Sequence, residues 1–385
     1  MFQLTQTDGL ARLGSLTTGR GEFPTPAFMP VGTQGSVKGT SPRELGELGV
    51  PIILGNTYHL MIRPGLPAIR HLGGLHGFSG WSGPILTDSG GYQVFSLAPL
   101  REISDAGVAF RSHVDGAPLF LGPREALEAQ ADLGSDIAML FDECPPWAAD
   151  GAAIARAVDR TLSWARESRR LIDAWRDEGG VLPAGQRHFA IVQGGASADL
   201  RAQCAAELVA LRFDGYAIGG VSVGEPEDMM FAAVDATAPH LPADRPRYAM
   251  GLGMPHQIVE LVARGVDLFD CVLPTRMARH GSAFTWDGLL HLHNAPFALD
   301  PSPIETGCAC YACQTFSRAY IRHLLKSREI LGLRLVTLHN LHFYMRLMAA
   351  IRDAIAGGCF GQFRRDAVAR LRSRETGECI DETTE

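Results

Sequence analysis

The stretch FAIVQGG at residues 189–195 is an apolar run of strand length that ends in one polar residue and two glycines. Seven similar runs occur before residue 275, and longer segments with helical periodicity separate them. Apolar strands that alternate with helices predict a parallel sheet covered by helices on both faces. The expected strands are Phe28–Thr33, Ile52–Asn56, Ile85–Asp88, Ile137–Asp142, Phe189–Gln193, Tyr216–Gly219, Arg247–Gly251 and Leu268–Leu273.

Eight strand–helix units fit a closed α/β barrel, the (β/α)8 TIM barrel, which we predict over residues 1–275. An open doubly wound sheet is the competing fold. Ser41-Pro42-Arg43-Glu44 has the pattern of a helix start. The other expected helices are Pro123–Leu133, Ala149–Arg176, Ser197–Leu211, Glu225–Ala238 and Pro255–Arg264.

The ends of the expected strands carry the polar residues. Asp88, Asp142, Gln193 and Asp270 all stand at or near such an end. The active site of a parallel barrel lies at the carboxyl ends of its strands, so these side chains are expected to share one mouth. Several buried carboxylates at one site are costly and therefore indicate catalysis or ligand binding.

The alternation of strands and helices stops after residue 275. A hairpin region, a cysteine cluster and three helices follow, which predicts a zinc-binding subdomain over residues 276–372 and a polar tail over residues 373–385. The three expected helices are Phe316–Lys326, Leu341–Ala356 and Gln362–Arg372.

Cys308, Cys310 and Cys313 place three thiols within six residues. Zinc prefers four tetrahedral sulfur and nitrogen ligands, and structural sites have no open position. His339 or His342, where we expect a helix to begin, supplies the fourth ligand. We therefore predict one structural Zn²⁺ ion per subunit.

Composition narrows the classes of function. The net charge is −7, which argues against a protein coated in basic charge such as a histone-like binder. The chain has two Lys residues, Lys38 and Lys326, so lysine Schiff-base chemistry has few candidates. The N-terminus has no secretory pattern and no apolar run is long enough to span a membrane, so we expect a cytoplasmic protein without membrane partners.

Five segments together resemble the bacterial-type tRNA-guanine transglycosylase family. They are DSGGYQ (88–93), FDEC (141–144), VQGG (192–195), GGVSVGE (219–225) and FDCVLPTR (269–276). The cysteine cluster followed by His339-Asn340-Leu341 is similar to the zinc subdomain of the same family, which favours His339 as the fourth ligand. The resemblance also implies a (β/α)8 barrel.

The resemblance implies a base exchange that removes guanine from the wobble position of tRNA and inserts a 7-deazaguanine. Asp270 would be the nucleophile that forms a covalent ribosyl intermediate, and Asp88 the general acid/base. The base pocket would comprise Ser89, Tyr92, Asp142, Cys144, Gln193, Gly220, Val221 and Met250.

Further expectations follow from the same resemblance. Arg276 and Arg279 would bind the tRNA anticodon loop. Cys144 and Val223 match the bacterial pattern, so 7-aminomethyl-7-deazaguanine (preQ1) is the expected incoming base. Members of the family are commonly homodimers.

Two other functions compete with this interpretation. A zinc-dependent barrel hydrolase of the amidohydrolase type would need His-x-His at the end of the first strand, where Val31-Gly32-Thr33-Gln34 stands instead. A non-catalytic tRNA-binding paralogue would lack the catalytic carboxylates, whereas Asp88 and Asp270 are both present.

Overall fold

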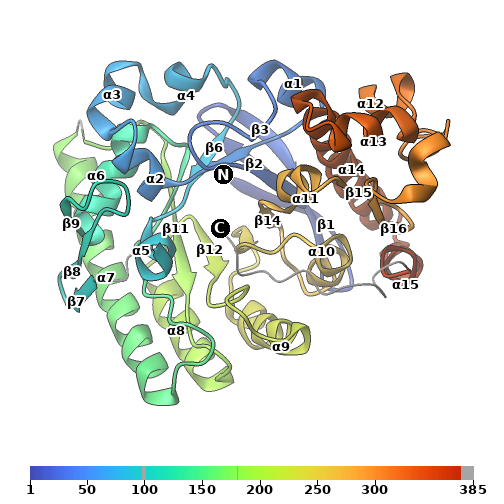
Figure 1. Ribbon diagram of the computed structural model, residues 1–385. Coiled ribbons are helices and arrows are strands. Elements are labelled where there is room, and N and C mark those ends of the chain that lie inside the picture. The colour runs from blue at the N-terminus through green and yellow to red at the C-terminus, as the bar shows by residue number, and fades with distance from the viewer. Residues whose placement is uncertain (98–100, 180, 374–385) are drawn as a thin grey trace.

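The structure, a computed structural model, describes residues 1–97, 101–179 and 181–373. Eight parallel strands close into a barrel in the order β10-β11-β12-β13-β14-β4-β5-β6. Figure 1 shows the strands at the centre with the helices around them. The predicted (β/α)8 barrel is therefore confirmed, and the open sheet is wrong. The barrel strands are β4 (Ala27–Gly32), β5 (Ile53–Gly55), β6 (Ile85–Thr87), β10 (Ile137–Met139), β11 (Arg187–Val192), β12 (Gly215–Ile218), β13 (Arg247–Ala249) and β14 (Leu268–Cys271).

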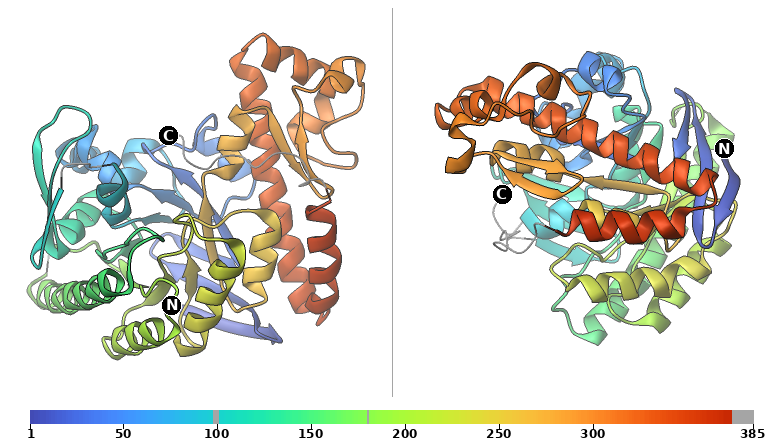
Figure 2. Two further views of the ribbon diagram at one scale, coloured as in Figure 1. Left: turned by 60° about the horizontal axis from the view of Figure 1, so that its bottom comes forward. Right: turned by 90° about the vertical axis from the view of Figure 1, so that its right-hand side faces the viewer.

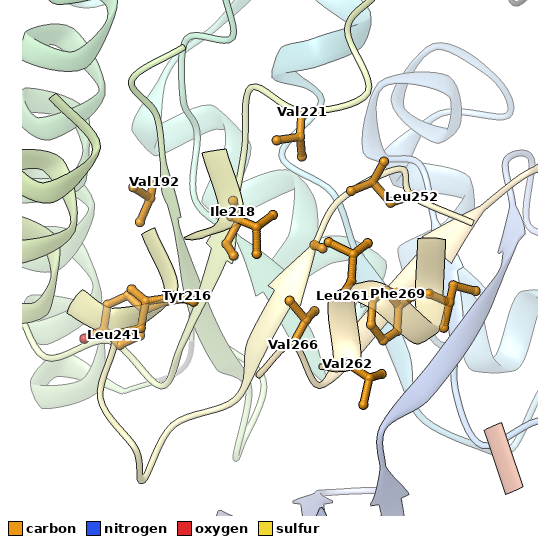
Figure 3. Close-up of a cluster of buried hydrophobic side chains, with 14 of the residues drawn as sticks. Val192, Tyr216, Ile218, Val221, Leu241, Leu252, Leu261, Val262, Val266 and Phe269 are labelled. Carbon is orange, nitrogen blue, oxygen red and sulfur yellow. The ribbon is translucent and has the colours of Figure 1, made fainter. Parts of the chain in front are cut away.

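Both faces of the barrel wall are apolar. Along β11, Phe189 and Ile191 join the core inside the barrel, whereas Ala190 and Val192 join the core beneath the helices. Figure 3 shows part of the outer core, where Val192 and Phe269 from the strands lie in one cluster with Leu261 of α10 (Pro255–Val262). Burial on both faces explains why the strands read as continuous apolar runs.

Helices connect the barrel strands. The helix start predicted at Ser41 is correct: the Ser41 hydroxyl accepts a hydrogen bond from the Glu44 N–H, and the Glu44 carboxylate accepts one from the Ser41 N–H. The helices are α1 (Pro42–Glu47), α2 (Thr57–Ile62), α3 (Leu66–His71), α4 (Gly74–Ser79), α5 (Gly91–Leu97), α6 (Pro123–Leu133), α7 (Gly151–Glu178), α8 (Ala198–Ala210), α9 (Glu227–Thr237), the 3₁₀ turn η1 (Ala238–His240) and α11 (Leu273–Arg279).

Two small antiparallel sheets were not predicted. β1 (Phe2–Asp8), β2 (Ala11–Thr18) and β3 (Gly21–Thr25) precede the barrel, and β7 (Arg101–Ser104), β8 (Gly107–Arg111) and β9 (Pro118–Leu121) form an insertion after α5. Their exposed and buried residues are mixed, so they lack the apolar runs that mark the barrel strands.

The C-terminal unit stands beside the barrel (Figure 2). It has its own cluster of buried side chains, among them Leu292, Ile321 and Leu335. Its elements are the hairpin β15 (Ser282–Thr285) and β16 (Gly288–His291), η2 (Ala295–Leu299), α12 (Tyr311–Thr315), α13 (Arg318–Lys326), α14 (Ile330–Ala356) and α15 (Phe360–Leu371). The division at residues 275 and 276, which falls within α11, stays a prediction.

The long helix α14 corrects one expectation. We expected its start near Leu341, but it begins at Ile330, so His339 and His342 lie in its interior. The residue before it, Glu329, makes no side-chain capping hydrogen bond, and the usual sequence signal of a helix start is therefore missing. The expected polar tail lies, from residue 374 onward, outside the described residues.

Among the residues that the structure describes, no helix combines the length and the apolar character needed to cross a membrane.

Candidate active site and candidate metal centre

The three predicted carboxylates lie at the same end of the barrel. Asp88 follows β6, Asp142 comes shortly after β10, and Asp270 stands within the last residues of β14. All three side chains are buried. The three carboxylates therefore share one mouth, because parallel strands bring their carboxyl ends to one rim.

Asp88 is held by three donors. Asn56 Nδ2 lies 2.5 Å and Gln93 Nε2 lies 3.0 Å from Oδ2, while the Thr57 N–H lies 2.8 Å from Oδ1. Burial nevertheless raises the pKa of Asp88 to about 6, and the negative charge of Asp270 adds to this effect. A carboxyl with such a pKa can exchange protons near neutral pH, as a general acid/base must.

Asp270 has a different environment. The Tyr248 hydroxyl donates to its Oδ1 at 2.6 Å, and the Gly251 N–H donates to the same oxygen at 2.7 Å. Burial raises the pKa of Asp270, and these two hydrogen bonds oppose that shift by favouring the ionised form. Among the described residues no hydrogen bond reaches Oδ2, so this oxygen is available to a ligand.

Asp142 belongs to a neighbouring polar pocket. Gln193 Nε2 donates to its Oδ2 at 2.7 Å, and the Ser89 hydroxyl lies 3.5 Å from its Oδ1. Burial raises the pKa of Asp142 to about 7. The Gln193 Oε1 is buried and has no hydrogen-bond partner among the described residues, so the amide has unused capacity for a ligand.

The glycine pair Gly219-Gly220 follows β12 and lies against the Gln193 amide. A Cβ atom on Gly219 would stand 2.6 Å from Gln193 Nε2, and one on Gly220 would stand 2.6 Å from Oε1. Gly220 also has a φ of +61°, which favours glycine. A small cavity here is lined by Gln193, Gly220, Gly195, Val223, Ile154, Trp147, Pro146 and Pro145.

Cys144 lies close to these groups. Burial raises the pKa of its thiol to about 12, although the Gly220 N–H and the Gln193 amide act in the opposite direction. The thiol is therefore protonated at neutral pH and unsuited to nucleophilic attack. Its position supports a role in shaping the pocket.

The other predicted pocket residues are placed as follows. Tyr92 stands on α5 with 50% of its surface exposed. Met250 directly follows β13 and packs against the inner core of the barrel. Val221 is buried in the outer cluster of Figure 3, beyond the end of β12. The role of Tyr92 and Met250 in stacking against a base stays a prediction.

Arg276 and Arg279 lie on α11, directly after the strand that carries Asp270. Arg276 is half-buried and Arg279 is exposed, with its Nη1 3.5 Å from the Thr275 hydroxyl. A guanidinium group suits phosphate oxygens, and the role of these two residues in tRNA binding stays a prediction.

The candidate metal centre consists of Cys308, Cys310, Cys313 and His339, whose ligand atoms lie within 4.8 Å of one another. His339 Nδ1 is 3.9, 3.5 and 3.3 Å from the three sulfur atoms in that order. Tetrahedral zinc would separate sulfur and nitrogen ligands by roughly 3.5 Å, given its usual bond lengths. The geometry fits a metal ion of this kind.

A second contact supports the same assignment. His339 Nε2 lies 2.8 Å from the Phe284 carbonyl oxygen. Because a carbonyl only accepts, Nε2 carries the proton and the Nδ1 lone pair faces the sulfur atoms, as metal-binding histidines require. His339, rather than His342, completes the four-residue group.

Several residues that hold this site carried no role in the sequence analysis. They are Asn56, Thr57, Gln93, Tyr248 and Gly251. Asn56 and Gly251 end predicted strands and Thr57 directly follows one, and this position was the available signal. Tyr248 lies within a strand, and no pattern in the sequence distinguishes it from core residues.

A closed (β/α)8 barrel with buried carboxylates at its mouth and a thiol–histidine cluster beside it defines a class, the (β/α)8 barrel enzymes, whose active sites lie at this end of the strands. Comparison with known proteins gives the family. The sequence profile of the family described as queuine tRNA-ribosyltransferase matches residues 7–373. The chain belongs to this family, and the predicted resemblance is confirmed.

Individual relatives support the same family assignment. A queuine tRNA-ribosyltransferase of Pelotomaculum thermopropionicum is 55% identical over 94% of this chain and 95% of its own length. Proteins of the same name from Symbiobacterium thermophilum and Acidithiobacillus ferrooxidans are each 53% identical, over 95% and 97% of this chain and 89% and 98% of their own lengths.

Proposed function

We propose that this protein exchanges guanine at the wobble position of tRNA for a 7-deazaguanine base, as a transglycosylase of queuosine synthesis. The observation that carries the proposal is the pair of buried carboxylates, Asp88 and Asp270, at one barrel mouth in a chain of this family. Burial raises the pKa of both carboxyls, and hydrogen bonds to each oppose the shift. The two roles are assigned from geometry: both oxygens of Asp88 accept hydrogen bonds, whereas Asp270 accepts them only at Oδ1 among the described residues, which leaves Oδ2 for attack.

In the first step Asp270 Oδ2 attacks the anomeric carbon of the ribose while the bond to guanine breaks. The bonding electrons leave with the base, and Asp88 delivers the proton that the departing base needs. A covalent ribosyl ester results, as in retaining glycosidases. The incoming base then loses a proton to Asp88 and displaces Asp270, so the reaction is balanced without water.

The pocket around Asp142 recognises the base. Ionised Asp142 accepts hydrogen bonds from the N1–H and the exocyclic amine, and the second Gln193 amide proton and the Gly220 N–H donate to the carbonyl oxygen. Ser89 supports Asp142 from its other side. Tyr92 and Met250 would cover the two faces of the ring.

The incoming base is proposed to be preQ1. This choice depends on the family pattern at Cys144 and Val223, and on the Val221 carbonyl as the acceptor for the aminomethyl group. The choice of preQ1 over other 7-deazaguanines is therefore separate from the proposal of base exchange itself.

The remaining partners follow from position and chemistry. Arg276 and Arg279 would hold the anticodon loop. A tRNA substrate in turn favours a cytoplasmic protein.

The cluster of Cys308, Cys310, Cys313 and His339 would hold one structural zinc ion, with four protein ligands and no open position. Tyr311 and Tyr320, exposed on the same unit beside Phe316, are a surface suited to a homodimer.

Neither competing function receives support. Over the described residues the one group suited to metal binding lies in the C-terminal unit, whereas a zinc-dependent hydrolase needs its metal at the mouth. A non-catalytic paralogue has no need of the hydrogen-bonded carboxylates that surround the mouth.

Labelled guanine exchange into tRNA tests the proposal. The wild-type protein should incorporate guanine and form a tRNA adduct that survives denaturation. Asp270→Asn should abolish both, whereas Asp88→Asn should abolish turnover and leave tRNA binding intact. Wild-type exchange by Asp270→Asn would refute the role of the nucleophile, and absence of exchange in the wild type would refute the function.

A further inference from the structure

Arg201 of α8 is a fully buried arginine beside the proposed base pocket. Its Nε donates to the Gly195 carbonyl at 2.7 Å, Nη1 to the Gly219 carbonyl at 3.1 Å and Nη2 to the Gly220 carbonyl at 3.3 Å. One guanidinium thus joins the loop after β11 to the loop after β12, which are the loops that carry Gln193 and Gly220.

The guanidinium of Arg201 has no ion-pair partner among the described residues, and Glu225 acts on its charge only from a longer distance. The other contact of Arg201 is the Thr237 hydroxyl at 3.5 Å. Burial lowers its pKa to about 10, so it remains protonated at neutral pH. A buried charge that has hydrogen bonds but no ion pair is costly, which indicates that the contacts of Arg201 serve a purpose.

The direction of the carbonyl groups determines the direction of the peptide N–H groups. In a trans peptide the C=O and the N–H point in opposite directions. With the Gly219 oxygen held by Arg201, the N–H of Gly220 points away from Arg201, toward Cys144 and the pocket. A glycine pair has little intrinsic preference for one orientation of this peptide.

We propose that Arg201 is a positioning residue for base recognition: by holding the Gly219 and Gly220 carbonyls it keeps the Gly220 N–H as a donor that selects bases with a ring carbonyl. The inference rests on the proposed function and deepens it. Bases with an amino group at that ring position would present a donor to a donor and be rejected.

The test compares the full-length wild type with Arg201→Met. We expect the KM for guanine to rise about tenfold, the size of one lost hydrogen bond, while kcat and the dissociation constant for tRNA change less than about threefold. 2,6-Diaminopurine, which carries an amino group in place of the carbonyl, serves as the competing base. Its inhibition constant relative to the KM for guanine should fall about tenfold, because only guanine loses a contact.

Arg12→Met is the matched control. Arg12 is also buried, and its guanidinium donates to the Ala243 and Arg245 carbonyls and pairs with Asp267, next to β13 and β14 at their amino-terminal ends. This variant should lower the unfolding temperature without changing the ratio of the 2,6-diaminopurine inhibition constant to the KM for guanine. Arg201→Lys keeps the charge but cannot reach three carbonyls, so it should lie between wild type and Arg201→Met, and it replaces Arg201→Met if that variant does not fold.

The inference would be overturned if folded Arg201→Met, or Arg201→Lys, kept the wild-type ratio of the 2,6-diaminopurine inhibition constant to the KM for guanine. The same follows if Arg201→Met and Arg12→Met alter KM, kcat and tRNA binding alike, because a merely structural role would then suffice. A wild-type protein without guanine exchange would instead refute the proposed function, so the two failures are distinguishable.

Discussion

The Tyr248 hydroxyl donates a hydrogen bond of 2.6 Å to Oδ1 of Asp270, across the adjacent strands β13 and β14. This contact stabilises the ionised carboxylate against the burial that raises its pKa. Tyr248→Phe should therefore raise the pKa of Asp270 further. A hydrogen bond to a charged group is worth about 1.5 kcal/mol or more, so the acid limb of the pH–rate profile should move up by about one unit.

Tyr216→Phe provides the control for that measurement. Tyr216 is buried on the neighbouring strand β12 but joins the outer cluster, beneath the helices (Figure 3). The same loss of a hydroxyl there should leave the pH–rate profile unchanged. If both variants shift the acid limb equally, the effect does not come from the contact with Asp270.

Asp142→Asn should stabilise the protein at alkaline pH. The pKa of Asp142 is raised from 3.8 to about 7 in the folded protein, so the unfolded chain releases this proton first. Stability is therefore lost as pH rises from about 4 to about 7, and it stays lost above that range. The neutral amide has no such penalty, so the unfolding temperature of the variant should exceed that of wild type at pH 8.

Near pH 4 the advantage of Asp142→Asn should disappear, because the wild-type side chain is then protonated in the folded state. Guanine exchange should fall strongly in the variant, since the amide replaces one acceptor oxygen with an NH2 donor, whereas the base edge presents two donors. An equal stability difference at pH 4 and pH 8 would contradict the raised pKa.

Removal of the metal should affect the C-terminal unit first. Cys310→Ser takes away one of four ligands, so the zinc content should fall from about one ion per chain to near zero, with a lower unfolding temperature. Atomic absorption and calorimetry measure the two effects. The exposed Cys359 is the control, because Cys359→Ser should change neither. Full zinc retention by Cys310→Ser would exclude this cluster as the metal site.

Arg279→Ala should weaken tRNA binding without changing the KM for guanine. If Arg279 contacts a phosphate, the slope of log affinity against log salt concentration should become shallower by about one. Arg170→Ala, on the exposed face of α7 where Arg170 pairs with Glu167, should leave that slope unchanged. A normal slope in Arg279→Ala would remove this residue from the tRNA site.

The sequence was most informative where burial imposes a pattern. All eight barrel strands were predicted because each is apolar on both faces, and the carboxylates were placed together because parallel strands end at one rim. The antiparallel sheets β1–β3 and β7–β9 were missed because their strands are partly exposed and therefore lack continuous apolar runs.

Contacts between segments that lie far apart in the chain could not be predicted from the sequence. Arg201 lies in an ordinary helical sequence, and its partners are backbone carbonyls at residues 195, 219 and 220, which no side-chain pattern reveals. Tyr248 is similar, since only the register of β13 against β14 brings it to Asp270. The start of α14 was misplaced because Glu329 provides no capping signal.

The spacing of residues along α14 ties the metal cluster to the barrel. His339 faces the three cysteines, the next residue Asn340 donates to the Pro274 carbonyl at the start of α11, and Tyr344 donates to the Gly253 carbonyl beyond β13. Inserting one residue between Asn340 and Tyr344 would rotate the rest of the helix by about 100°. Insertions and deletions within these few residues would therefore separate the cluster from the barrel mouth, whereas a substitution at an exposed position of α14 would leave this register unchanged.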